Sequence, residues 1–164
     1  IEIFSEQDED PEPPESFKQN ILGLQEAFAD LNLDTNYSVK PSSVVHVILV
    51  SDKFIHDINL NYRAEDSVTD VITFSYLDDV AVPWEEEGRL DGEIYIAREQ
   101  ANRQALTHNA NYDQELTLLA VHGLLHIYGL DHENSDAEHR HMLKLEKELL
   151  SQLGLEKILP LTHS

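Results

Sequence analysis

The feature that most constrains the fold is a run from Leu116 to Leu130 that contains no Asp, Glu, Lys or Arg. Asp113 lies just before the run, where an acidic side chain favours the start of a helix. Gly129 lies near its end and can close a helix. The run falls short of the ~20 residues that a membrane-spanning helix needs. It therefore predicts a buried helix that begins near Asn111 and against which the other elements pack.

Shorter patterned segments surround this helix, with apolar residues at helical or strand spacing. Further helices are expected over residues 16–33, 52–61, 98–106 and 135–154. Strands are expected over residues 44–50, 71–74 and 93–97. Strands and helices alternate with short connections, and a hydrophobic content of 41% is enough for one core. The sequence thus predicts an α/β or α+β fold in which helices cover one small mixed sheet.

The charge is strongly acidic and unevenly placed. The chain has 11 Lys and Arg against 32 Asp and Glu, a formal net charge of −21. This argues against a protein that coats nucleic acid or an anionic membrane with a uniformly basic surface. Residues 1–15 contain many carboxylates, three prolines and no Lys or Arg. We expect a mobile acidic arm there, followed by a single domain over residues 16–164, with a second acidic segment at 77–93 forming a solvated loop.

The absence of cysteine limits the chemistry of any metal site. Disulfides and thiolate ligands are excluded, so a metal must be bound by His, Asp or Glu. Nine histidines are present. The first residues show no signal-peptide pattern. We therefore expect a cytoplasmic protein that does not enter a membrane.

Three histidines have the spacing of a metal site. His122 and His126 are four residues apart on the expected buried helix, so both imidazoles leave one face and can bind the same ion. Gly129 allows a sharp reversal that would bring His132 back as a third ligand. Three neutral imidazoles with an open fourth position are typical of catalytic zinc, here one ion per chain. A zinc protease of the familiar pattern would have Glu as its general base where this chain has Gly123, so a peptidase is disfavoured.

The string His122-Gly123-Leu124-Leu125-His126, followed by Gly129-Leu130-Asp131-His132, closely resembles the signature of the YbeY family of metal-dependent endoribonucleases. Three more blocks resemble the family in the family's order: Leu60-Asn61-Tyr62-Arg63, Thr69-Asp70-Val71-Ile72-Thr73-Phe74 and Gly92-Glu93-Ile94-Tyr95-Ile96. The resemblance covers residues 44–155, and residues 1–43 show no signature. The chain departs from the family at Leu130, where Tyr is usual, and at Glu93, where Asp is usual.

The resemblance implies a zincin-like α+β fold of a single domain, with a sheet of four strands and a zinc ion bound by His122, His126 and His132. It also implies cleavage of single-stranded RNA in the maturation of the 16S rRNA 3′ end and in ribosome quality control. Ribosomal RNA and proteins of the small ribosomal subunit are the implied partners. Arg63 matches the family's functional arginine, and its planar guanidinium can bind one phosphate in two places. The expected catalytic residues are therefore Arg63 and His122.

Other interpretations stay open at this point. Arg63 could form an ordinary surface ion pair with Glu65 or Asp66. Asp131 and Glu133 could orient an imidazole, accept a proton from metal-bound water, or be solvated turn residues. The protein could be a non-catalytic ribosome-assembly factor with a structural zinc, or a metal-dependent peptidase whose base comes from elsewhere in the chain. The nucleophile, water or the RNA 2′-hydroxyl, and the oligomeric state are not determined by the sequence.

Overall fold

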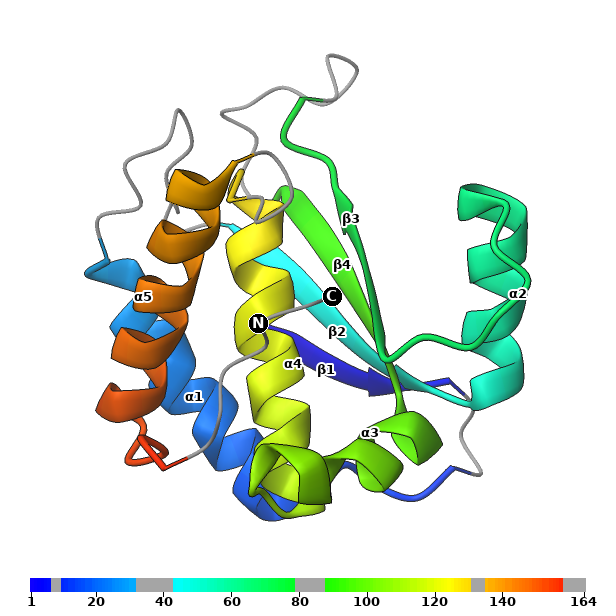
Figure 1. Ribbon diagram of the computed structural model, residues 1–164, viewed down its shortest axis with the longest axis horizontal. Helices are drawn as coiled ribbons and strands as arrows, with labels where there is room; N and C mark the ends of the chain where they lie inside the picture. The colour runs from blue at the N-terminus through cyan, green and yellow to red at the C-terminus, as the bar shows by residue number, and fades with distance from the viewer. Residues whose placement is uncertain (7–9, 32–42, 79–87, 131–134, 158–164) are drawn as a thin grey trace.

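A four-stranded sheet lies at the centre of the protein (Figure 1). The computed structural model describes residues 1–6, 10–31, 43–78, 88–130 and 135–157. The strands are β1 (Glu2–Ser5), β2 (Val44–Val50), β3 (Val71–Ser75) and β4 (Leu90–Ala97), in the order β1-β2-β4-β3. β1 and β4 run parallel to β2, and β3 runs antiparallel to β4 at one edge. The prediction of an α+β fold with a mixed sheet of four strands is confirmed.

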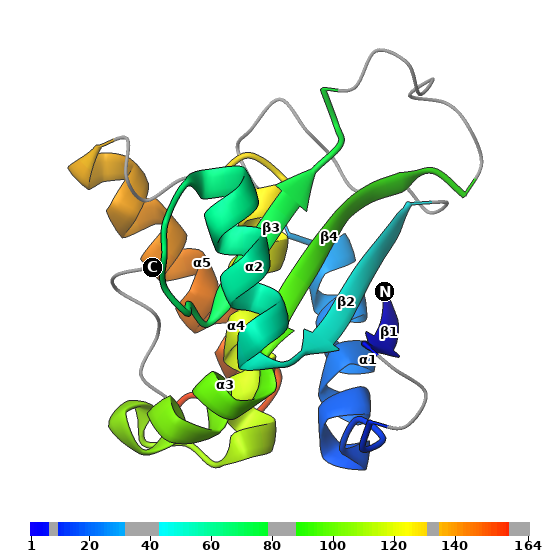
Figure 2. The ribbon, with the colours of Figure 1, turned by 90° about the vertical axis from the view of Figure 1, so that its right-hand side faces the viewer.

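Helices cover both faces of this sheet (Figures 1 and 2). One layer contains α1 (Glu15–Ala29), α4 (Tyr112–Ile127) and α5 (Asp136–Gln152), with α4 packed on β3 and β4. The opposite face is covered by α2 (Asp52–Arg63), which also contacts β3 and β4. α3 (Arg98–Gln104) and the 3-10 turn η1 (Ala105–His108) connect β4 to α4. No helix in the described part of the chain has the length and apolar character needed to cross a membrane.

α4 is the buried helix predicted by the uncharged run. Residues 115–125 are all buried, because the sheet lies on one side of the helix and α1 and α5 lie on the other. A capping box begins the helix: Asn111 Oδ1 accepts from the Gln114 N–H and Gln114 Oε1 accepts from the Asn111 N–H, both at 2.9 Å. Local side chains thus set where α4 starts, and tertiary packing buries it.

The end of α4 makes the reversal expected at Gly129. This residue has a φ of +93°, which a residue without Cβ adopts at little cost. The N–H of Leu130 donates to the carbonyl of Leu125 at 3.1 Å, and the N–H of Gly129 donates to that of His126 at 3.1 Å. The chain therefore turns directly after the histidine pair. His132 lies beyond the turn, outside the described residues.

The N-terminal segment differs from the expected acidic arm. Residues 2–5 form β1, whose backbone pairs with β2, and Ile1 and Ile3 pack against the core. The carboxylate of Asp10 lies 3.3 Å from Arg98. For residues 2–5 the prediction of an arm is wrong, because apolar contacts and backbone hydrogen bonds hold this segment on the sheet.

The second acidic segment is also structured where the structure describes it. β4 begins at Leu90, and Asp91 is buried within it. Tyr128 Oη donates to Asp91 Oδ2 at 2.7 Å, and Arg89 Nε lies 3.9 Å from Asp91 Oδ1. Residues 79–87 lie outside the described residues. The loop prediction is thus wrong for residues 90–93, where a buried carboxylate is paired rather than solvated.

Gly123 lies where α4 crosses β4, and a side chain there should destabilise the protein. A Cβ at this position would come within 2.8 Å of Ile94 Cγ2, which is in the core. We expect Gly123→Ala to lower the free energy of unfolding by about 1–2 kcal/mol, since overpacking outweighs the gain in helix propensity. Urea denaturation measures the change.

The matched control is Gly23→Ala in α1, where a Cβ would meet Leu153 Cδ2 at the same 2.8 Å. Leu153 is only partly buried and its terminal methyl can move, so this variant should retain the stability of the parent. Equal losses of stability in the two variants would contradict the explanation.

Candidate metal centre and substrate site

The two helical histidines meet on one face of α4. The Nε2 atoms of His122 and His126 lie 3.0 Å apart, and their ring centroids lie 4.6 Å apart. Two nitrogens bound to one tetrahedral zinc at ~2.0–2.1 Å are separated by about 3.3 Å. The observed distance is close to this value. The two imidazoles therefore fit a zinc ion in donor type and in spacing.

Glu146 of α5 fixes the orientation of the His122 ring. His122 Nδ1 donates to Glu146 Oε1 at 2.5 Å, and both side chains are buried. A proton on Nδ1 places the lone pair on Nε2, the atom that faces His126. A carboxylate behind a ligating histidine fixes its tautomer and raises its basicity. This contact between α4 and α5 therefore fixes the His122 ring in the orientation that a metal ligand requires.

Glu146 is not part of any motif that the sequence presents, although its position in α5 carries a signal. The residue lies on the apolar face of α5, next to Leu145 and one turn before Leu149, both of which are buried. A carboxylate on the buried face of a helix requires a partner, because an isolated buried charge is costly. The pattern indicates that a partner exists, but it does not say which residue it is.

His132, Asp131 and Glu133 all lie outside the described residues. Within the described ranges, no group of three or more His, Asp or Glu side chains is arranged to hold a metal. The described part of the chain therefore contributes the histidine pair and the carboxylate behind it.

Removal of the Glu146 charge should weaken zinc binding. We expect Glu146→Gln to reduce zinc affinity by about 10–100-fold while the chain stays folded, because an amide holds the Nδ1 proton less strongly. A competitive titration with a chromophoric chelator measures the affinity. Glu148→Gln, on the exposed side of the same helix, should bind zinc like the parent. If both variants match the parent, Glu146 has no role at the metal.

Arg63 ends α2, on the face of the sheet opposite α4. Its side chain is 47% exposed, and its Nη2 atom lies 4.0 Å from Glu65 Oε1. Asp66, the other expected partner, lies instead 2.6 Å from His56 Nε2. An exposed ion pair as long as that with Glu65 contributes only ~0–1 kcal/mol. The Arg63 guanidinium can therefore exchange this carboxylate for another anion at little cost.

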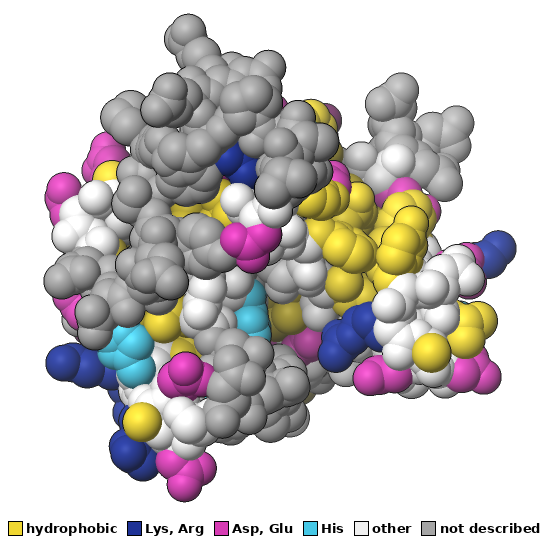
Figure 3. Space-filling model, turned by 90° about the horizontal axis from the view of Figure 1, so that it is seen from above, with side chains coloured by type: hydrophobic (Ala, Val, Ile, Leu, Met, Phe, Trp, Pro, Cys, Tyr) yellow, Lys and Arg dark blue, Asp and Glu magenta, His cyan; other side chains and the backbone are white. Residues whose placement is uncertain are grey.

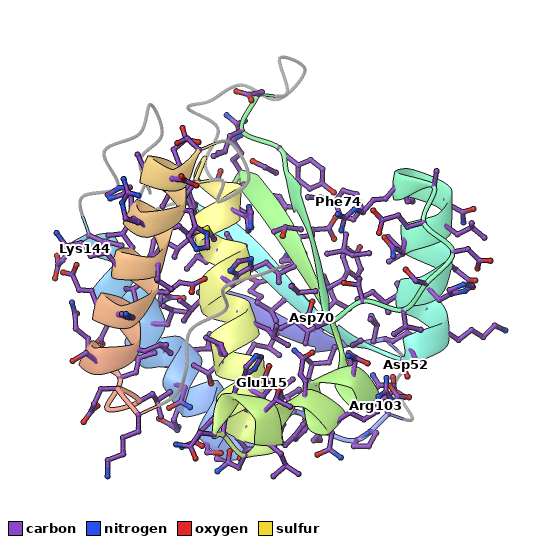
Figure 4. All side chains as sticks on the ribbon, viewed as in Figure 1. Asp52, Asp70, Phe74, Arg103, Glu115 and Lys144 are labelled. Atoms are coloured by element: carbon purple, nitrogen blue, oxygen red, sulfur yellow. The ribbon has the colours of Figure 1, made fainter. Side chains whose placement is uncertain are left out.

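The carboxyl end of β3 connects the two sides of the candidate site. Ser75 Oγ donates to the carbonyl of Ile127, next to the histidine pair, at 2.9 Å. Phe74, on the α2 side of β3 (Figure 4), packs against Tyr62, next to Arg63, with ring centroids 5.5 Å apart. Figure 3, which views the molecule from above, shows His, Lys or Arg, hydrophobic, and Asp or Glu side chains exposed on this face. The histidine pair and Arg63 thus flank one strand end.

Glu93, a departure from the resembled family, lies on the α2 face of β4. Tyr76 Oη donates to Glu93 Oε1 at 2.5 Å, and Tyr95 Oη donates to Glu93 Oε2 at 3.2 Å. Burial, followed by the hydrogen bond to Glu93, raises the pKa of Tyr76. Burial and the negative charge of Glu93 raise the pKa of Tyr95. Both tyrosines therefore stay protonated at neutral pH and donate to the carboxylate rather than acting as bases.

Comparisons with known proteins agree with this fold and sequence pattern. The family model described as Endoribonuclease YbeY matches residues 4–154 of the chain. The chain belongs to the YbeY endoribonuclease family. The family resemblance inferred from four sequence blocks is thereby confirmed, and it extends into the segment before residue 44.

Individual relatives place this YbeY-family protein among endoribonucleases. The Endoribonuclease YbeY of Thermodesulfovibrio yellowstonii is 41% identical over 111 residues, which cover 67% of each chain. That of Desulforamulus reducens is 32% identical over 143 residues, which cover 87% of this chain and 92% of the relative. The solution structure of TM1509 from Thermotoga maritima is similar to this chain, with a TM-score of 0.54 and 25% sequence identity. The match covers 93% of this chain and 87% of the TM1509 chain. The fold and the family are therefore shared over nearly the whole chain.

Proposed function

We propose that this YbeY-family protein is a zinc-dependent endoribonuclease that cleaves single-stranded RNA, and that it matures the 3′ end of 16S rRNA and serves ribosome quality control. We assign one zinc ion to His122, His126 and His132. The observation that carries the assignment is the 3.0 Å approach of the His122 and His126 Nε2 atoms, with His122 held by the buried Glu146. Family membership supports RNA as the substrate.

The residues of the site have separate roles. A divalent ion, when bound, supplies Lewis acidity that activates a nucleophile and polarises a phosphoryl oxygen. His122, oriented by Glu146, and His126 provide two imidazole ligands from one helix face. Arg63 binds the phosphate and stabilises the negative charge that develops on it, because a guanidinium stays charged and can donate two parallel hydrogen bonds.

We further propose that the protein works in the cytoplasm beside the small ribosomal subunit, with ribosomal RNA and proteins of that subunit as partners. The absence of cysteine from the sequence is compatible with a reducing compartment. The relatives are named as endoribonucleases, which supports RNA as the substrate of this chain.

The packing around Gly123 disfavours a peptidase with its general base at this position, and family membership supports RNA rather than peptide as the substrate of a chain whose base lies elsewhere. A Cβ at position 123 would point at Ile94 in the core. A general base at this position would therefore enter the packing between α4 and β4. Zinc proteases of the familiar pattern have their general-base Glu at this place in the helix, and this chain has Gly123 there.

Cleavage assays with the purified chain test the proposed function. The protein should cut a single-stranded RNA and a 16S rRNA 3′-end precursor, lose this activity in a chelator and regain it with zinc. Full cleavage in the chelator would contradict the metal assignment. Zinc binding without cleavage of any RNA would favour the non-catalytic assembly factor. A 2′,3′-cyclic phosphate on the product would identify the RNA 2′-hydroxyl as nucleophile, and an open phosphate would identify water.

A further inference from the structure

Four aromatic side chains form a row that leads from the core under α2 to the surface beside Arg63. Phe54 stacks on Tyr95 with ring centroids 5.9 Å apart, Tyr95 meets Phe74 edge to face at 5.8 Å, and Phe74 meets Tyr62 at 5.5 Å. The first three rings are half-buried and pack against the small core between α2 and the sheet. Tyr62 is 73% exposed. The row thus ends in an exposed ring that is supported from one side.

An exposed aromatic ring with a fixed support has the properties of a nucleobase-stacking residue. Stacking of a base on an aromatic side chain contributes ~1–3 kcal/mol and accepts any base, because every base has a π face. Only an unpaired base can use such a ring, since bases in a duplex are stacked on each other. The 77° angle between the Tyr62 and Phe74 rings shows an edge-to-face contact, which holds Tyr62 without covering both of its faces.

One basic side chain, Arg63, lies at the exposed end of the row and favours a nucleic acid strand as the occupant. Arg63 follows Tyr62 directly and can bind the phosphate beside a stacked base. Glu93 faces Phe74 across the paired strands, but its carboxylate accepts hydrogen bonds from Tyr76 and from Tyr95. The net charge of −21 gives a polyanion no general attraction to this chain. The binding free energy must therefore come from local contacts. Base stacking is such a contact, and salt does not screen it.

The row reaches β3 at Phe74, one residue before the contact of β3 with the end of α4. The Phe74 ring contacts the Tyr62 ring. The next residue, Ser75, donates a hydrogen bond to the carbonyl of Ile127 at the end of α4. Tyr62 and the histidine pair therefore lie on opposite sides of the β3 end. This arrangement gives a base and its phosphate separate contacts.

We propose that Tyr62, supported by Phe74, stacks on an unpaired base of the RNA whose phosphate is bound by Arg63. This inference rests on the proposed RNA cleavage and extends it, because it assigns the preference for single strands to a stacking residue. Tyr62 is a binding residue in this proposal. It takes no part in proton transfer.

The experiment measures binding of a short single-stranded RNA to the full chain by stopped-flow fluorescence, before cleavage proceeds. A 2-aminopurine is placed at each position of the RNA in turn, because its emission is quenched when it stacks. Tyr62→Ala should weaken binding by about ten-fold and remove the quenching, whereas Tyr62→Phe should retain both. The loss should be the same at low and high salt, while the loss caused by Arg63→Ala should shrink as salt rises.

The matched control is Phe4→Ala. Phe4 is an aromatic residue that is 42% exposed, makes an edge contact with His46, and lies on β1 at the opposite edge of the sheet. This variant should bind RNA like the parent. An RNA with an abasic site at the quenched position should bind the parent about ten-fold more weakly, and Tyr62→Ala should cause no further loss.

The outcomes separate the stacking role from the proposed function. Parent-like affinity of Tyr62→Ala would overturn the stacking role while leaving RNA cleavage in place. Equal losses in Tyr62→Ala and Phe4→Ala, or equal losses for single-stranded and duplex RNA, would also overturn it. A parent chain that neither binds nor cuts any RNA would instead overturn the proposed function.

Discussion

His126→Ala should leave the chain folded but remove most of its zinc and reduce RNA cleavage by more than about 100-fold. The loss of a carboxylate behind a ligand already costs 10–100-fold in affinity or activity, so loss of a ligand itself should cost more. His126 is only partly buried, and its replacement should affect the core little. Elemental analysis of the purified variant gives the zinc content, and a cleavage assay on single-stranded RNA gives the rate.

A second histidine provides the control for this experiment. His46 lies on β2, where it contacts Glu2 and Phe4, away from α4. His46→Ala should keep one zinc per chain. Stoichiometric zinc in a folded double variant, His122→Ala with His126→Ala, would show that the metal is bound elsewhere.

Arg63→Lys should keep the zinc and the stability of the parent but lose about 100–1,000-fold in the rate of RNA cleavage. Lys retains the positive charge but lacks the planar fork that binds a phosphate in two places. Removal of a single donor that stabilises transition-state charge typically costs this much. Stability should change little, because the exposed pair with Glu65 is long and weak. Single-turnover cleavage rates, together with zinc content and thermal unfolding, test these expectations.

The matched control is Arg103→Lys in α3. Arg103 is also half-exposed and lies 2.7 Å from Asp52 on α2, at the end of the molecule opposite Phe74 (Figure 4). Its replacement should leave cleavage unchanged. Full RNA cleavage by Arg63→Ala would show that Arg63 only forms a surface ion pair and has no role in the reaction.

The sequence predicted most elements because their signals are local. The uncharged run and the Asn111 side chain indicated α4, and apolar periodicity indicated the strands β2, β3 and most of β4. β1 was missed because an acidic, proline-containing segment concealed a short apolar alternation at Ile1 and Ile3. An edge strand of this kind depends on a partner far along the chain, and its own residues do not identify that partner.

The sequence alone determined that His122 and His126 share one face, because the helical repeat places side chains four residues apart side by side. It also supplied the family, through motifs that the family model matches. Only the tertiary structure decided that Glu146 of α5 holds the His122 ring, and that Arg63 and the aromatic row flank the β3 end beside the histidine pair. The physical reason is that spacing within one helix follows from local backbone geometry. Contacts between elements instead follow from the packing of the whole core, which leaves no periodic signal in the sequence.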